Sequence, residues 1–225
     1  MGRRAAGPGQ ADGDGTTFPK RIATPRGTRY HLYRSLSIQG LGPSGSHAWT
    51  LPVRIEFDEY VIRDWSGADA AAIAKYANNR NIAMWLRDRF PHPYTLCDAK
   101  VFLSLVLKQD PRIAFAIATN VEAIGGIGLE FGTDVHRFGA ELGYWLAEPY
   151  WGRGIMSGAV RRFTAWAFEN LDVYRIHAAV FADNAASVRV LEKAGFQREA
   201  CLRASVFKDG RILDQWLFAR VKDGI

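Results

Sequence analysis

The order of elements between Glu141 and Phe196 limits the fold more than any other feature of this sequence. The residues predict a strand at 141–147, a glycine-rich turn leading into a long helix, a second strand at 174–181 and a second helix at 183–196. One compact βαβα unit of this kind offers an anion-binding helix end together with a polar cluster at the mouth of the second strand.

The turn before the long helix reads Trp151-Gly152-Arg153-Gly154-Ile155-Met156. Its glycines let the backbone approach a ligand closely, and the first N–H groups of the helix have no acceptor within the helix. With the charge of Arg153 beside them, these N–H dipoles suit an anion such as a pyrophosphate. A tight turn without a ligand is the alternative interpretation of so short a glycine motif.

The same glycines resemble a loose dinucleotide-binding fingerprint. A doubly wound domain needs several further βα units after its first glycine turn, and an acidic residue about twenty positions on. Only residues 155–225 follow, they end in a hairpin, and Asp183 comes too late to be that acid. The sequence therefore gives NAD binding little support.

The remaining elements predict one α/β domain at 53–225 with a mixed central sheet. Strands are expected at 60–65, 112–119 and 123–131, and helices follow residue 65, at Met84–Arg87 and at Asp98–Lys108. Thr95 is a candidate N-cap for the last of these helices. Two final strands, 201–207 and 212–221, flank Asp209-Gly210, which is a strong hairpin signal.

Residues 1–52 predict a flexible tail. They are rich in Gly, Pro, Arg and Ser without steady periodicity. Seven basic and two acidic residues fall in this segment, so it holds five of the six net positive charges of the chain. Weak contact with RNA, the ribosome or an acidic partner through this tail is one hypothesis, and a solvated extension is the other.

Other features of the composition indicate a soluble, cytoplasmic protein. The chain has no apolar run that could span a bilayer, and its start lacks the hydrophobic centre of a secretory signal. Cys97 and Cys201 are too few for a disulfide framework, and we expect both to be packing or surface residues rather than nucleophiles.

The segment from Glu141 to Phe196 resembles the acetyl-CoA-binding core of the GCN5-related N-acetyltransferases, the GNAT superfamily. Within that superfamily it resembles the branch that acetylates ribosomal-protein N-termini. The resemblance is carried by Glu141-Leu-Gly-Tyr-Trp-Leu146, the Tyr150-Trp-Gly-Arg-Gly154 loop, Asp183-Asn184-x-x-Ser187 and Leu191-Glu-Lys-Ala-Gly-Phe196. It extends weakly back to about Tyr60 and does not cover the first fifty residues.

The resemblance implies a GNAT-type acyl-CoA N-acyltransferase fold, with helices on both faces of the sheet and a C-terminal β-hairpin. It also implies acetyl-CoA as co-substrate and no metal. The phosphate loop would be Trp151–Met156, backbone N–H groups of Tyr144, Trp145 and Leu146 would polarise the thioester, and Asn184 would lie against the pantetheine arm. Ser187 takes the position of the general acid in relatives that act on ribosomal proteins. Locally, Asn184 and Ser187 also fit as an N-cap and a first-turn polar residue.

Three positions depart from the family pattern. Met156 replaces the last small residue of the loop, where its side chain can fill core volume. Leu191 stands where many relatives outside this branch have a tyrosine acid. Val206 stands where ribosomal-protein acetylating relatives have an acidic base, so the acceptor can be a protein N-terminus, a lysine or a small amine.

Acyl transfer to an amine also requires a group that removes a proton. At pH 7 an α-amino group with a pKa of about 8 is mostly protonated. The candidates are Glu141 and Glu130, acting directly or through a water held by Tyr144. Their alternative role is that of solvated or salt-bridged strand residues. The resemblance places Trp85 and Tyr94 in the region where acceptor-side helices lie in this family. We expect these two residues and Glu130 to contact the substrate.

These observations predict an acetyl-CoA-dependent N-acetyltransferase that works by direct attack in a ternary complex. The alternative is a catalytically weak CoA-binding or RNA-associated module. A monomer or a homodimer is compatible with the sequence.

Overall fold

The computed structural model describes residues 1–2 and 52–224. Its strands are β1 (Arg54–Phe57), β2 (Tyr60–Asp64), β3 (Ala114–Ala118), β4 (Ala123–Phe131), β5 (Gly139–Leu146), β6 (Arg175–Phe181), β7 (Gln197–Lys208) and β8 (Arg211–Val221). Its helices are α1 (Ala70–Ala77), α2 (Arg80–Ala83), α3 (Leu96–Val106), α4 (Ile155–Asn170) and α5 (Ala185–Lys193), with short 3-10 turns η1 (Gly67–Asp69), η2 (Asp134–His136) and η3 (Glu148–Tyr150).

The eight strands form one sheet in the order β1-β2-β3-β4-β5-β6-β8-β7. All neighbours are antiparallel except β5 and β6, which the α4 crossover makes parallel. These two strands pair only from Gly139↔Arg175 to Glu141↔His177, although β5 continues to Leu146 and β6 to Phe181. The sheet therefore opens between β5 and β6 toward their carboxyl ends.

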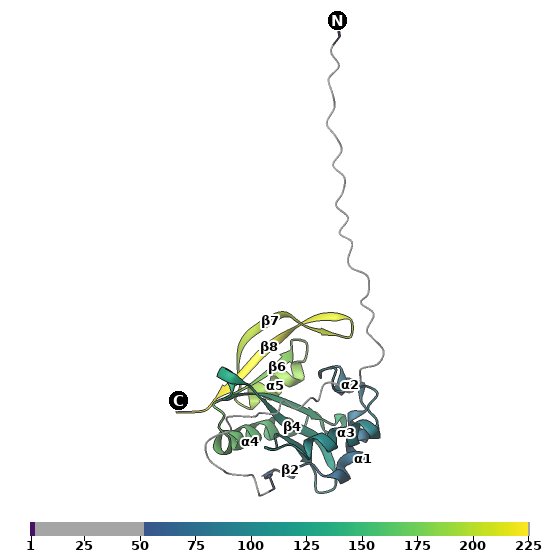
Figure 1. The fold of residues 1–225 in the computed structure, drawn as a ribbon, viewed down its shortest axis with the longest axis vertical. Helices are drawn as coiled ribbons and strands as arrows, with labels where there is room; N and C mark the ends of the chain where they lie inside the picture. The colour runs from purple at the N-terminus through teal and green to yellow at the C-terminus, as the bar shows by residue number, and fades with distance from the viewer. Residues whose placement is uncertain (3–51, 225) are drawn as a thin grey trace. The chain divides into compact units, whose positions relative to one another are not determined.

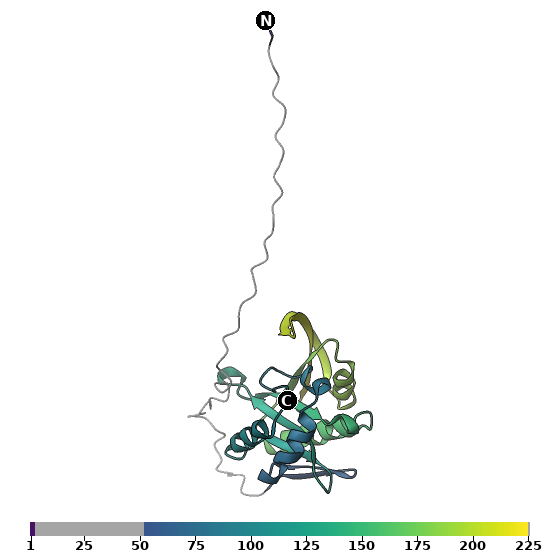
Figure 2. The same ribbon diagram turned by 90° about the vertical axis from the view of Figure 1, so that its right-hand side faces the viewer.

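Helices cover both faces of the sheet, as predicted (Figures 1 and 2). On one face α4 buries Val160 and Phe163 against alternate residues of the strands, including Phe115 and Ile117. On the other face α1 and α3 enclose a second cluster around Trp65, with Ile73, Leu103 and Ala116. Neighbouring strand residues belong to different clusters because successive side chains point to opposite faces.

The predicted mixed α/β architecture and C-terminal hairpin are confirmed. Strand β4 has the predicted bounds, and Thr95 caps α3 in a capping box with Asp98. Asp209 and Gly210 have φ of 51° and 78°, the two positive values that a type I′ hairpin turn requires.

One local prediction was wrong, and one strand was missed. The helix expected at Met84–Arg87 is α2, four residues earlier, because the Asn79 side chain accepts a hydrogen bond from Asn81 N–H and begins the helix there. Strand β1 was not predicted. It is a short edge strand that pairs with β2, and its Phe57 lies over Gly158 of α4.

The described residues from 53 onward fall within one compact unit, whereas the predicted tail at 1–52 lies almost entirely outside the described residues. Cys97 and Cys201 are exposed free thiols. Within the described part of the chain, every helix is too short or too polar to cross a membrane.

Candidate active site

The glycine loop joins β5 to α4 at the open end of the β5–β6 pair. Gly152 and Gly154 have φ of 76° and 79°, where a side chain would be strained, and no atom lies within 4 Å of the place of a Cβ at either residue. Trp151 Nε1 donates to the Leu146 carbonyl at 2.7 Å, and Arg153 Nη2 donates to the Pro149 carbonyl at 2.9 Å. The loop is thus tied to β5 and to η3 while its glycines stay uncovered.

Helix α4 begins at this loop with Gly154 as its N-cap and no side-chain cap. The first hydrogen bond of the helix runs from Gly158 N–H to the Gly154 carbonyl, so the N–H groups before Gly158 have no acceptor within the helix. The side chains of Ile155 and Met156 are buried in the core. Only their backbone can reach an anion, and Met156 fills core volume as predicted.

The gap between β5 and β6 is lined by the backbone of β5. Gly132 N–H donates to the Gly139 carbonyl, and Ala147 N–H donates to the Ile124 carbonyl. Both bonds are made by odd-numbered residues, one in β5 and one directly after it, so the backbone N–H and C=O groups of odd-numbered residues bond to β4. The backbone groups of even-numbered residues face the other way, and the N–H groups of Tyr144 and Leu146 therefore point away from β4 toward the gap. This alternation corrects the prediction for Trp145, whose N–H belongs to the β4 ladder.

Trp145 has a packing role on the opposite face. Its ring lies 6.0 Å from that of Phe90, and a Cβ on Gly126 would come within 2.7 Å of its Nε1. A side chain at Gly126 would therefore displace the indole. Trp145 thus packs against the second core cluster, and its N–H makes no hydrogen bond across the gap.

Tyr144 and Ser187 meet on the α4 side of the gap. The Tyr144 hydroxyl and Ser187 Oγ lie 2.6 Å apart, and Ser187 N–H donates to Asn184 Oδ1 at 3.0 Å. Burial raises the pKa of Tyr144 above its usual range, so this phenol keeps its proton at neutral pH. The pair can pass a proton toward an atom in the gap, while Asn184 caps α5 as its local pattern predicted.

The two candidate bases form an ion-pair cluster on the other face. Glu130 and Glu141 are cross-strand partners, Arg87 bonds to Glu130 at 3.1 Å and to Glu141 at 2.5 Å, and Arg89 bonds to Glu130 at 2.8 Å. Although burial acts to raise the pKa of Glu130, Arg89 and Arg87 together hold it below its usual range. Glu130 is therefore a poor proton acceptor.

The structure does not support a water relay from Glu141 to Tyr144. The two residues are three positions apart on one strand, so their side chains lie on opposite faces of the sheet. Tyr144 packs in the α4 cluster, whereas Glu141 meets Arg87 beyond α2.

Sequence reasoning missed Arg87 and His177 as members of this site. His177 of β6 is the register partner of Glu141, and it shares the face on which Phe181 lies. One signal was available for His177: it is the one ionisable residue in the otherwise apolar stretch from Ile176 to Phe181. The Arg87 contact spans 54 residues, which local patterns cannot reveal.

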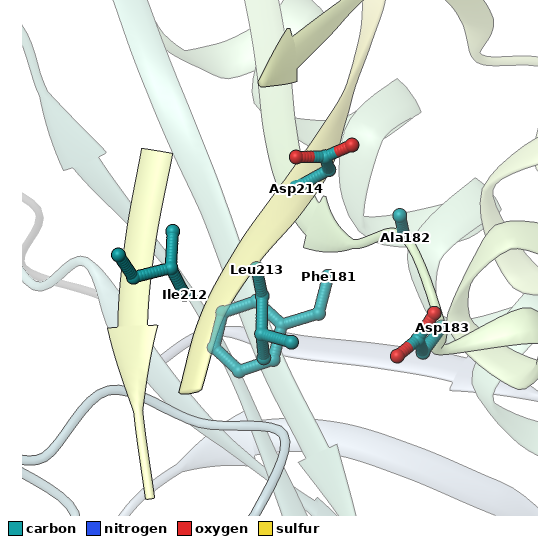
Figure 3. Close-up of a pocket in the computed structure, with 6 residues that line it drawn as sticks. All are labelled: Phe181, Ala182, Asp183, Ile212, Leu213 and Asp214. Carbon is teal, nitrogen blue, oxygen red and sulfur yellow. The ribbon is translucent and has the colours of Figure 1, made fainter. Parts of the chain in front are cut away.

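The predicted acceptor residues have different surroundings. The Trp85 ring lies 6.3 Å from that of Phe181 at the carboxyl end of β6. A pocket of about 240 Å³ lies next to Phe181, where the end of β6 meets the start of β8. In Figure 3 the side chains of Phe181 and Leu213 lie in the middle of this group, with Ile212 on one side and Asp183 on the other. Tyr94 is only 6% exposed and packs on Phe90 in the second core cluster. Trp85 therefore packs at the carboxyl end of β6, and Tyr94 is a core residue.

Among residues 1–2 and 52–224, no group of three or more His, Cys, Asp or Glu side chains is arranged to hold a metal ion.

Comparisons with known proteins agree with this geometry. The family model for the acetyltransferase (GNAT) domain matches residues 60–197. The uncharacterized N-acetyltransferase YoaA of Bacillus subtilis is 30% identical over 171 residues, which cover 75% of this chain and 96% of YoaA.

Solved structures share the fold. The ribosomal-protein-S5-alanine acetyltransferase from Vibrio fischeri is 29% identical, with a TM-score of 0.67 over 76% of this chain and 97% of that one. RimL, a ribosomal L7/L12 α-N-protein acetyltransferase in complex with coenzyme A, is 21% identical, with a TM-score of 0.68 over 76% and 99% of the two chains.

Proposed function

This chain belongs to the GNAT family of acetyltransferases and is an N-acetyltransferase, and from that premise we propose that it transfers the acetyl group of acetyl-CoA to a primary amine by direct attack in a ternary complex. Acetyl-CoA supplies the acyl group as a thioester. The protein binds it, polarises it and moves the protons.

Binding is the task of the glycine loop and the gap. The uncovered backbone at Gly152 and Gly154 and the first turn of α4 provide N–H groups for the pyrophosphate, and Arg153 adds a positive charge. The N–H groups of Tyr144 and Leu146 face the gap, where they can donate to the thioester carbonyl oxygen and stabilise negative charge that develops on it.

The observation that carries the proposal is the hydrogen bond between Tyr144 and Ser187. A module that only binds CoA needs the glycine loop and the gap, but it has no use for a protonated phenol that shares a hydrogen bond with a serine hydroxyl beside them. In an acetyltransferase the Ser187 hydroxyl protonates the departing thiolate, and Tyr144 supplies the proton in return.

A protein N-terminus is the acceptor that the similarities favour. The Vibrio fischeri relative is named for a ribosomal-protein acceptor, and an acceptor of that kind would fit the predicted cytoplasmic location. A lysine side chain or a small amine is the other acceptor class, since Val206 provides no carboxylate on β7. The choice between monomer and homodimer stays a prediction.

Thermal unfolding tests the co-substrate. Acetyl-CoA at about a hundred times its dissociation constant should stabilise the protein by about 2.7 kcal/mol, whereas NADPH should not. Gly154→Ala should abolish most of this shift, because a Cβ would enter the loop at a strained φ of 79°. Gly67→Ala is the matched control, since Gly67 has no positive φ and no neighbour within 4 Å of its Cβ position. A shift with NADPH instead would contradict the proposal.

Turnover separates the enzyme from the binding module. Free thiol from acetyl-CoA is measured with a peptide carrying a free N-terminal alanine, a lysine peptide with a blocked N-terminus, and a small diamine. Thiol release that depends on one of these amines is the expected result. Binding of acetyl-CoA without release in any of the three would favour the module.

A further inference from the structure

The β5 and β6 strands part immediately after the pair formed by Glu141 and His177. Because these residues are register partners in parallel strands, their side chains lie on the same face, the face that carries Arg87. Phe181 lies on this face of β6 four residues further on, where it contacts Trp85. His177 therefore stands at the closed end of the gap, on the side from which the acceptor amine would enter.

Neighbouring groups leave His177 as the available proton acceptor. Arg87 occupies Oε1 of Glu141, and Arg87 and Arg89 converge on Glu130. A proton on either carboxylate would weaken the ion pair that this carboxylate makes with Arg87. His177, by contrast, is half-buried beside Glu141, in a position where that carboxylate stabilises an imidazolium once it forms.

The charges around His177 come from three other elements and from its own strand. They are Glu141 of β5, Arg87 of the segment after α2, Glu199 of β7 and Arg175 of β6. Arg175 and Glu199 pair with each other, which largely cancels their effect. Burial lowers the pKa of His177 below 6.5, with Glu141 opposing and Arg175 assisting. The imidazole is therefore neutral at pH 7 and able to accept a proton.

We propose that His177 is the general base of the reaction and that Glu141 is its positioning residue. This inference rests on the proposed acetyltransferase function. His177 takes one proton from the acceptor ammonium and later gives it to solvent. The neutral nitrogen then forms the new C–N bond as the C–S bond breaks. The nitrogen loses its second proton to solvent as the amide forms. Ser187 gives its proton to the thiolate and regains one from Tyr144, which solvent reprotonates.

The dependence of kcat/KM on pH tests this role with the alanine peptide, whose amine has a pKa of about 8. In the wild-type chain the rate should stay level from pH 8 down to the pKa of His177, because the base accepts a proton from the bound ammonium, and it should fall only below that value. In His177→Gln only the neutral amine reacts, so kcat/KM should fall about tenfold per pH unit from pH 8 downward. An NMR titration of the histidine rings should give a pKa below 6.5 for His177. This pKa should match the pH below which kcat/KM of the wild-type chain falls.

Two further measurements make the test specific. His177→Gln should bind acetyl-CoA as tightly as the wild type by calorimetry, and His136→Gln, in the exposed η2 turn, should keep the wild-type profile. Turnover in His177→Gln with the wild-type pH profile would overturn this inference alone. No turnover by the wild-type chain with any amine would overturn the proposed function, and this inference with it.

Discussion

Ser187 combines two functions that a single substitution separates. Its backbone N–H completes the cap of α5 on Asn184, and its hydroxyl bonds to Tyr144. Ser187→Ala keeps the cap and removes the hydroxyl that we propose as the proton donor to the thiolate. We expect kcat to fall by about 10² or more, and the free energy of unfolding to change by about 1 kcal/mol or less.

Steady-state thiol release and urea denaturation of Ser187→Ala give both quantities. Ser205→Ala is the control, because it removes an exposed serine hydroxyl that bonds only within the β7–β8 hairpin. A Ser187→Ala enzyme with the kcat of the Ser205→Ala control would show that another group protonates the thiolate.

At the scale of single residues, the sequence could predict only what local spacing encodes. Asn184 and Ser187 are three positions apart and share one helical turn, so their contact followed from the pattern. The roles of Glu130 and Glu141 depend on Arg87 and Arg89, which are 41 to 54 residues away. No periodicity reports a contact over that distance, so the sequence could offer ion pairing as an alternative for the two carboxylates but could not name their partners.

At the scale of elements, the tip of the β7–β8 hairpin is held to the segment after α2 by a lysine. The Lys208 side chain is only 8% exposed, and its Nζ lies 2.7 Å from Oδ1 of Asp88, which is 82% exposed. Removing the carboxylate leaves a buried ammonium without its partner, whereas replacing the lysine by a similar apolar side chain removes the charge itself. The two substitutions should therefore differ in effect.

We expect Asp88→Ala to lower the free energy of unfolding by about 1–3 kcal/mol, and Lys208→Met to change it by less than about 1 kcal/mol. Urea denaturation measures both. Arg80→Ala, which breaks the exposed pair with Asp209 at the same hairpin tip, is the control and should cost at most about 1 kcal/mol. Equal losses in Asp88→Ala and Lys208→Met would mean that the ion pair itself stabilises the hairpin, and that burial of the ammonium costs little.

Elements with a strong local signal were predictable, and those defined by their neighbours were not. Strand β4 and the cap of α3 follow from β-rich composition and from the Thr95–Asp98 capping box. Strand β1 has four residues and exists because it pairs with β2 and packs on α4. The opening between β5 and β6 likewise depends on how two strands far apart in sequence pair. The sequence therefore predicted both strands but could not predict the gap between them.

At the scale of the whole molecule, we expect the folded unit to begin at Val53. Its N–H donates to Asp64 Oδ2 at 3.2 Å, and its side chain packs against the α4 cluster. Residues 1–52 carry five of the six net positive charges and no predicted element. A chain that starts at Val53 should keep the midpoint of thermal unfolding and the stabilisation by acetyl-CoA, because every contact of the sheet described above remains.

The same truncation tests the proposed contact with RNA. If the tail carries that contact, a single-stranded RNA should bind the full chain at low salt, should dissociate steeply as salt rises, and should not bind the chain that starts at Val53. The truncated chain is nearly neutral, so RNA binding that survives truncation would have to use the folded unit. Loss of cooperative unfolding in the truncated chain would instead place part of residues 1–52 inside the domain.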